Sequence, residues 1–224
     1  MAAEQAGRSP ADSFSRNVFL NVPFDSTYVP LLHAISFAVH DCGFQARCAA
    51  EKVDSGHNRL AKILDIIQDC KFGIHDISRV ELSAANHLPR FNMPFECGLF
   101  WGCMRFGDDR QRKKRLLVLD REANRYRGSI SDISGQDIGV HQDDPAKAIE
   151  AVRNFLSFSD GHRKLPGAEA IFRRYQLFQR ELTEIAEAME ISRAEMNKLD
   201  YFSDYLASVA YWLRSSDIKT PKKA

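Results

Sequence analysis

The sequence lacks the patterns that mark several protein classes. Its five cysteines show no CxxC spacing and no clustering with histidine, which argues against a zinc site and favours buried free thiols in a reducing compartment. No apolar run approaches membrane-spanning length, and the polar N-terminus lacks the apolar core of a signal peptide. The net charge is +1, so composition gives no general drive toward nucleic acid or anionic membranes. We therefore expect a cytoplasmic protein without a metal site or a membrane partner.

Glycine-rich phosphate-binding motifs are also missing. Neither GxGxxG nor GxxxxGK[ST] occurs in the chain, so no cofactor is expected on motif grounds. What the chain has is enough apolar material for a core, with 44% hydrophobic residues and 15 phenylalanines. Its 224 residues fit one medium-sized domain with an extension.

Short apolar runs alternate with helical patterns over residues 17–156. The predicted strands are 17–22, 44–49, 72–77, 116–120 and 138–140, and the predicted helices are 31–40, 60–67, one that opens near Pro94, and 145–155. This alternation indicates βαβ units, a parallel sheet and right-handed crossovers. The predicted fold is α/β: a flavodoxin-like, doubly wound sheet of five parallel strands in the order 2-1-3-4-5, with a C-terminal α-helical appendage.

Four segments follow from this pattern. They are a disordered lead-in over 1–16, the α/β domain over 17–158, a helical hairpin over 166–214 and a tail over 215–224. In the hairpin, Ser192 and Glu195 have the spacing of a capping box. Residues 182–199 also resemble a helix-turn-helix, with Glu190 where glycine is usual. Glu195 and Asp200 oppose phosphate binding, so a hairpin that packs on the sheet or on a second chain is favoured over a DNA-binding regulator using residues 168–214.

Ligands of open parallel sheets bind outside the carboxyl ends of the strands, which selects the segments that follow each predicted strand. These segments are 23–25, 54–56, 76–79, 92–96 and 120–121, and they are rich in carboxylates, hydroxyls and arginine. The candidate ligand-binding residues among them are Phe24, Asp25, Ser55, Gly56, Asp76, Ser78, Arg79 and Asn92. Turn chemistry explains Asp25 and Asp76 equally well, so both interpretations stay open.

Glu96 is the candidate catalytic residue. We place it in the first turn of the helix near Pro94, where the helix dipole favours an acidic residue on a solvated face. Its neighbours are almost all apolar, however, and an apolar wall raises a carboxylate pKa unless a charged partner is present. His40, His75 and Cys97 are interpreted as packing residues, because no catalytic partner is identifiable for them from spacing.

Two motifs carry a resemblance to known families. Asn21-Val22-Pro23-Phe24-Asp25 after the first strand, and the glutamate in Met93-Pro94-Phe95-Glu96-Cys97-Gly98-Leu99, resemble the nucleoside 2-deoxyribosyltransferase fold and equally TIR domains. The phrases over 73–79 and 89–94 are similar to those of a bacterial TIR-like subgroup. The small-residue pattern that precedes the glutamate in the transferases is replaced here by Met93-Pro94-Phe95.

The resemblance implies an N-glycosidase or ribosyltransferase with Glu96 as its nucleophile, acting on NAD or a nucleotide as substrate rather than cofactor. It implies a setting in bacterial defence against phage. Apart from the resemblance, we expect a homo-oligomer. Asp76 or Asp25 would then hold the ribose hydroxyls, Arg79 a phosphate, and Phe24 or Trp101 the base. The alternatives are a non-catalytic TIR-like module for nucleotide sensing or self-assembly, and the DNA-binding regulator.

Overall fold

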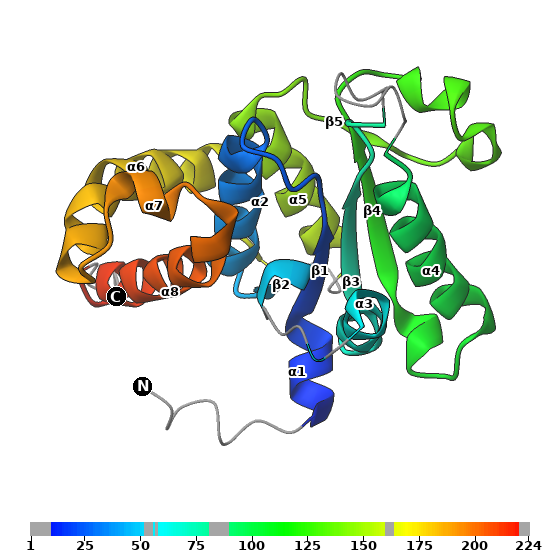
Figure 1. Ribbon diagram of the computed structural model, residues 1–224, viewed down its shortest axis with the longest axis horizontal. Coiled ribbons are helices and arrows are strands. Elements are labelled where there is room, and N and C mark those ends of the chain that lie inside the picture. Colours follow the sequence, from blue (N-terminus) through cyan, green and yellow to red (C-terminus); the bar gives the residue numbers. More distant parts are fainter. Residues whose placement is uncertain (1–9, 52–55, 57, 81–89, 160–163, 220–224) are drawn as a thin grey trace. The chain divides into compact units, whose positions relative to one another are not determined.

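The protein is represented by a computed structural model that describes residues 10–51, 56, 58–80, 90–159 and 164–219 (Figure 1). Its strands are β1 (Asn17–Asn21), β2 (Gln45–Arg47), β3 (Phe72–Asp76), β4 (Arg115–Asp120) and β5 (Gly139–Val140). They form one sheet in the order β2-β1-β3-β4-β5, and the pairs β1–β2, β1–β3 and β3–β4 are parallel. The predicted flavodoxin-like α/β fold with its 2-1-3-4-5 order is confirmed.

Eight α-helices are found in the described residues, joined in places by short 3-10 turns. They are α1 (Pro10–Arg16), α2 (Val29–Asp41), α3 (Arg59–Gln68), α4 (Asn92–Phe106), α5 (Pro145–Ser159), α6 (Ala168–Ala188), α7 (Arg193–Met196) and α8 (Phe202–Lys219). The chain divides into two compact units. The first runs up to Pro23 and from Phe44 to Ile138, and the second comprises 24–43 and 139–224. The predicted boundary between an α/β domain and an appendage stays a prediction.

The first unit has its core between the sheet and the helices α3 and α4. Phe19 of β1 packs in one buried cluster with Ile63, Ile66 and Ile67 of α3 and with Phe100 of α4. Full burial of side chains of this size stabilises the fold by about 1.5–3 kcal/mol each. The two helices therefore cover the same face of the sheet, the face that Phe19 presents.

Gly73 of β3 allows α4 to approach this face closely. A Cβ at this position would lie 2.5 Å from Nε2 of His75 and 2.9 Å from the Phe100 ring. The His75 ring in turn meets the rings of Phe19 and Phe100 edge-on, at centroid distances of 5.8 and 5.0 Å. The absent side chain thus fixes how near α4 lies to the strand ends.

The second unit is held together by aromatic side chains of α2, α6 and α8. The Phe37 ring of α2 contacts the rings of Phe178 and Trp212 at 5.4 and 5.9 Å. The Phe178 ring also lies 5.8 Å from that of Tyr205. The polar end of Trp212 is hydrogen-bonded, since its Nε1 donates to the Glu181 carboxylate at 2.7 Å. Buried tyrosine and tryptophan need such partners, so the polar contacts fix the packing as well as the apolar ones do.

Three predicted boundaries differ from the structure. Residues 10–16 form α1 instead of continuing a disordered lead-in, because Phe14 is buried and lies under the Arg110 guanidinium. Helix α4 begins at Asn92, so Glu96 lies in its second turn and not in its first. The second helix of the predicted hairpin is broken into α7, a 3-10 turn and α8, with Lys198 extended between them. The predicted capping box of Ser192 and Glu195 is confirmed at the start of α7.

All five cysteines are free thiols. Cys42, Cys48, Cys70 and Cys97 are buried, and Cys103 is half-buried. Burial raises the pKa of the thiols of Cys48, Cys70 and Cys97 to about 12, which keeps them protonated at neutral pH. These thiols therefore act as small apolar side chains in the core.

Candidate active site

An asparagine joins three elements at the carboxyl end of the sheet. The Asn21 amide at the end of β1 donates to the Met93 carbonyl of α4 at 2.7 Å, and it lies 3.0 Å from Nδ1 of His75 on β3. The bond to the carbonyl identifies the Asn21 atom as the amide nitrogen, so Nδ1 of His75 accepts. Burial and the nearby Lys114 charge lower the pKa of His75 to about 3, which keeps the ring neutral. The first turn of α4 is thereby anchored beside the ends of β1 and β3.

Glu96 lies one helical turn before Phe100 and therefore on the same, sheet-facing side of α4. Its side chain is half-buried, and within the described residues it makes no hydrogen bond or ion pair. Burial raises its pKa to about 7, against the opposing effect of the Arg59 charge at the start of α3. Glu96 is thus present in both protonation states near neutral pH, which suits a carboxylate that exchanges protons or captures a cation.

A second group of polar residues gathers at the ends of β3 and β4. The Arg125 guanidinium donates to Oδ1 of Asp120 from Nε at 2.8 Å and from Nη2 at 2.6 Å, and to the Ile77 carbonyl at 2.8 Å. Asp76 accepts the backbone N–H of Ser78 at 2.8 Å. Burial raises the pKa of Asp120, the Arg125 hydrogen bonds lower it, and the Asp76 charge raises it further. The Arg125 guanidinium thus pairs with Asp120, and the Asp76 carboxyl lies close enough to affect the Asp120 charge.

Ser78 is one residue of this group with unused hydrogen-bonding capacity. It is fully buried, and its hydroxyl has no hydrogen-bond partner among the described residues. A buried hydroxyl left without a partner is costly, which is a reason to expect one from a ligand.

The predicted residues Asp76, Asn92, Arg79 and Trp101 also belong to the first unit and have different relations to Glu96. Asp76 follows His75, so strand alternation turns it to the opposite face, and a ligand reaches both Asp76 and Glu96 only over the end of β3. Asn92 is exposed at the start of α4, and Arg79 is half-buried after β3. Trp101 is half-buried and projects about 140° around the helix axis from Glu96, so the structure does not bring these two side chains together.

Four predicted residues remain. Phe24 and Asp25 belong to the second unit, where the Asp25 carboxylate accepts from Thr27 Oγ1 at 2.6 Å and from the Tyr28 N–H at 3.0 Å. The turn interpretation of Asp25 therefore has direct support. Gly56 is exposed, and Ser55 lies outside the described residues.

The sequence interpretation missed Asn21, His75 and Arg125 as site residues, and it selected Asp120 only as part of the segment 120–121. Asp120 carried a usable signal, because it ends its strand as Asp76 ends the neighbouring one. Arg125 carried none, since four irregular residues separate it from Asp120 and only the 3-10 turn over Arg125–Gly128 brings it back. Asn21 stood in the resemblance motif, but its two partners lie 54 and 72 residues away.

Comparison with protein-family models finds no match to this chain, and comparisons with curated proteins and with solved structures find no significant similarity. Over the described ranges, no group of three or more histidine, cysteine, aspartate or glutamate residues could hold a metal ion. In the same part of the chain, no helix has both the length and the apolar character needed to cross a membrane.

Proposed function

We propose that this protein is an N-glycosidase or ribosyltransferase that acts on NAD or a related nucleotide, with Glu96 as its catalytic carboxylate. The observation that carries the proposal is Glu96 itself. It is a half-buried carboxylate with a pKa of about 7, without a hydrogen-bond partner in the described residues, on the helix anchored at the carboxyl ends of β1 and β3. This is the edge where ligands of open parallel sheets bind.

The reaction fits one carboxylate in an apolar wall. The bond between the ribose anomeric carbon and the base nitrogen breaks, and its electron pair leaves with the base. The ionised Glu96 stabilises the resulting oxocarbenium-like carbon or captures it as a covalent ester. Water then adds to the anomeric carbon and releases a proton, or a second acceptor takes the ribosyl group.

The resemblance to TIR-like domains is a further support, and it leads us to propose a cytoplasmic role in defence against phage. The free thiols agree with a reducing compartment. A ligand with both a base and a phosphate would span the end of β3, with Arg79 as the phosphate partner in this proposal.

A second candidate function is self-assembly triggered by a nucleotide. Helix α4 and the residue before it expose three large aromatics, with exposed fractions of 64% for Phe91, 53% for Phe95 and 87% for Phe106. Exposed aromatics in this number on one element favour a contact surface. By contrast, Arg193, which opens the proposed DNA-recognition helix, donates to Gln179 and Asn197 within its own unit. We therefore do not propose DNA binding.

The test is a turnover assay with NAD, NADP and a panel of nucleosides and nucleotides. Wild-type protein, Glu96→Gln and the control Glu150→Gln, which alters an exposed glutamate of α5, are compared. Base release by the wild type and Glu150→Gln but not by Glu96→Gln is the expected result. Equal release by Glu96→Gln would refute the assignment. No release from any protein, together with a nucleotide-dependent increase in sedimentation coefficient, would favour the assembly module.

A further inference from the structure

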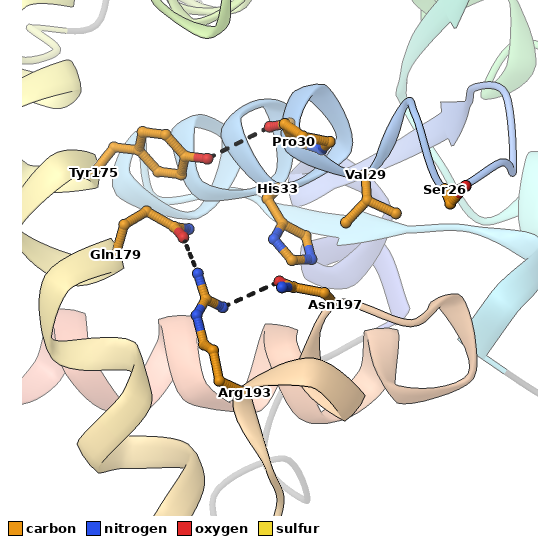
Figure 2. A pocket seen from close by; sticks show the side chains of 8 residues that line it. All are labelled: Ser26, Val29, Pro30, His33, Tyr175, Gln179, Arg193 and Asn197. Atoms are coloured by element: carbon orange, nitrogen blue, oxygen red, sulfur yellow. Dashed lines mark hydrogen bonds between the residues drawn. The ribbon is translucent and has the colours of Figure 1, made fainter.

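The second unit contains a pocket of about 380 Å³ between the start of α2, the middle of α6 and the segment around α7 (Figure 2). Its polar lining consists of Ser26, His33, Tyr175, Gln179, Arg193 and Asn197. None of these residues takes part in the proposed glycosidase site. The volume lies within the range of small-molecule binding pockets.

Arg193 brings a positive charge to this pocket. Its guanidinium donates to Oε1 of Gln179 at 2.6 Å and to Oδ1 of Asn197 at 3.2 Å, as Figure 2 shows. Both acceptors are neutral amides, and no carboxylate of the described residues forms an ion pair with Arg193. Two of its five N–H groups are used in these bonds, which leaves three donors and the full charge available.

The effect of this charge is visible on a neighbouring side chain. His33 has its pKa lowered to about 3, first by burial and then by the charge of Arg193. The pocket therefore holds a neutral imidazole beside a guanidinium whose charge is not cancelled. An anionic group bound near Arg193 would neutralise its charge, as a carboxylate side chain usually does.

His33 is the second observation that points to a ligand. Its side chain is only 4% exposed, and its ring stacks on that of Tyr205 with centroids 3.6 Å apart. Its ring nitrogens make no hydrogen bond to any described residue, and Figure 2 shows the ring directed toward Arg193 and Asn197. Because these nitrogens line the pocket and are bonded to nothing in the described chain, a bound group that donates to one or accepts from the other would find them available.

We propose that this pocket binds a small organic anion through a carboxylate or phosphate group, with the Arg193 guanidinium as the main partner and His33 as a neutral hydrogen-bonding partner. The planar guanidinium suits both kinds of anionic group, because each offers two oxygens at the spacing of two N–H donors. Val29 and Pro30 supply an apolar wall for the body of the ligand. The site is independent of the reaction proposed for Glu96.

The experiment titrates the full chain with inorganic phosphate, ribose 5-phosphate, gluconate and uncharged ribose, by calorimetry and by NMR of the Arg193 Nε–H and His33 ring signals. We expect one of the two organic anions to bind and shift both signals, and ribose to have no effect. Ribose 5-phosphate and gluconate separate phosphate from carboxylate recognition.

Removing one charged hydrogen-bonding partner in Arg193→Gln should weaken binding by roughly 10- to 100-fold. Arg193→Lys should restore only part of it, because the fork geometry is lost.

Two further variants distinguish specific binding from general charge effects and from misfolding. Arg180→Gln removes the same charge from an exposed position of α6 and should leave the affinity unchanged. Asn197→Asp, also at an exposed position, places a carboxylate beside Arg193 and should abolish anion binding in a folded protein. Failure of every anion to bind at millimolar concentration would overturn the proposal. Binding that survives both Arg193→Gln and Asn197→Asp would overturn it as well.

Discussion

Arg125 places two of its nitrogens, Nε and Nη2, on a single oxygen of the fully buried Asp120, at 2.8 and 2.6 Å. Nη2 also donates to the Ile77 carbonyl at 2.8 Å, just beyond β3. The other oxygen, Oδ2, has no hydrogen-bond partner in the described part of the chain. One guanidinium therefore carries most of the stabilisation of a buried carboxylate and links the ends of two strands.

Arg125→Gln should therefore destabilise the protein by about 3 kcal/mol at neutral pH, because removal of one partner leaves a buried charge uncompensated. Urea unfolding followed by circular dichroism measures the loss. Arg127→Gln, at an exposed position two residues later, should change stability by less than about 0.5 kcal/mol. Equal effects of the two substitutions would show that the Asp120 pair contributes little.

The rate of base release should depend on pH through Glu96. If its ionised form attacks, the rate rises with pH and levels off above about 7, the pKa to which burial raises this carboxyl. Below that pKa the rate falls about tenfold for each pH unit. Arg59→Gln removes the charge that opposes the shift, so the midpoint should move to higher pH. A profile whose midpoint stays at the ordinary glutamate pKa would contradict the assignment.

Glu96 should also make stability depend on pH in the opposite direction to most acidic groups. Its pKa is about 7 in the folded protein and 4.5 for an ordinary glutamate in the unfolded chain, so between these pH values the folded state binds more protons. Stability therefore falls as pH rises through this window. Glu96→Gln should stabilise the protein by about 1–2 kcal/mol at pH 8, after discounting for solvent screening of this half-buried group. At pH 4 the two proteins should unfold at nearly the same urea concentration.

Two glycines close to the site should respond to alanine in opposite ways. A Cβ at Gly73 would meet the His75 and Phe100 rings at 2.9 Å or less, so Gly73→Ala should destabilise the protein by about 1–3 kcal/mol. At Gly98, in the middle of α4, a Cβ meets no atom within 4 Å. Gly98→Ala should therefore stabilise the helix by about 0.5–1 kcal/mol through propensity alone. Thermal unfolding of both variants tests the contrast, and a stable Gly73→Ala protein would refute it.

The strand order could be predicted because buried parallel strands appear in the sequence as short apolar runs. β1, β3 and β4 show such runs, and the helices between them carry periodic apolar faces. Helix α1 was missed because one buried residue, Phe14, stands among polar ones and gives no periodic pattern. The start of α4 was misplaced because Phe91, its N-cap, makes no side-chain cap, so no sequence signal marks the boundary.

The candidate sites likewise contain residues that the sequence indicates and contacts that it does not. Asp76, Ser78 and Glu96 are selected from the sequence by the rule that ligands bind at the carboxyl ends of strands. The contacts of Asn21 and of Arg193 were not, because each depends on side chains brought together by folding from distant parts of the chain. His33 stands in an apolar helix and looks like any core histidine until its ring nitrogens are seen to face a pocket.

The buried thiols are distributed over both compact units, so their alkylation rates report on the opening of each unit in the wild-type chain. Cys42 belongs to the second compact unit, whereas Cys48, Cys70 and Cys97 belong to the first. An alkylating reagent attacks thiolates, so these positions react only from transiently opened forms of the protein. Mass spectrometry of the labelled peptides then follows the opening rate of each unit separately. Half-buried Cys103 serves as the reference, because the reagent can reach its thiol more easily than the four buried ones.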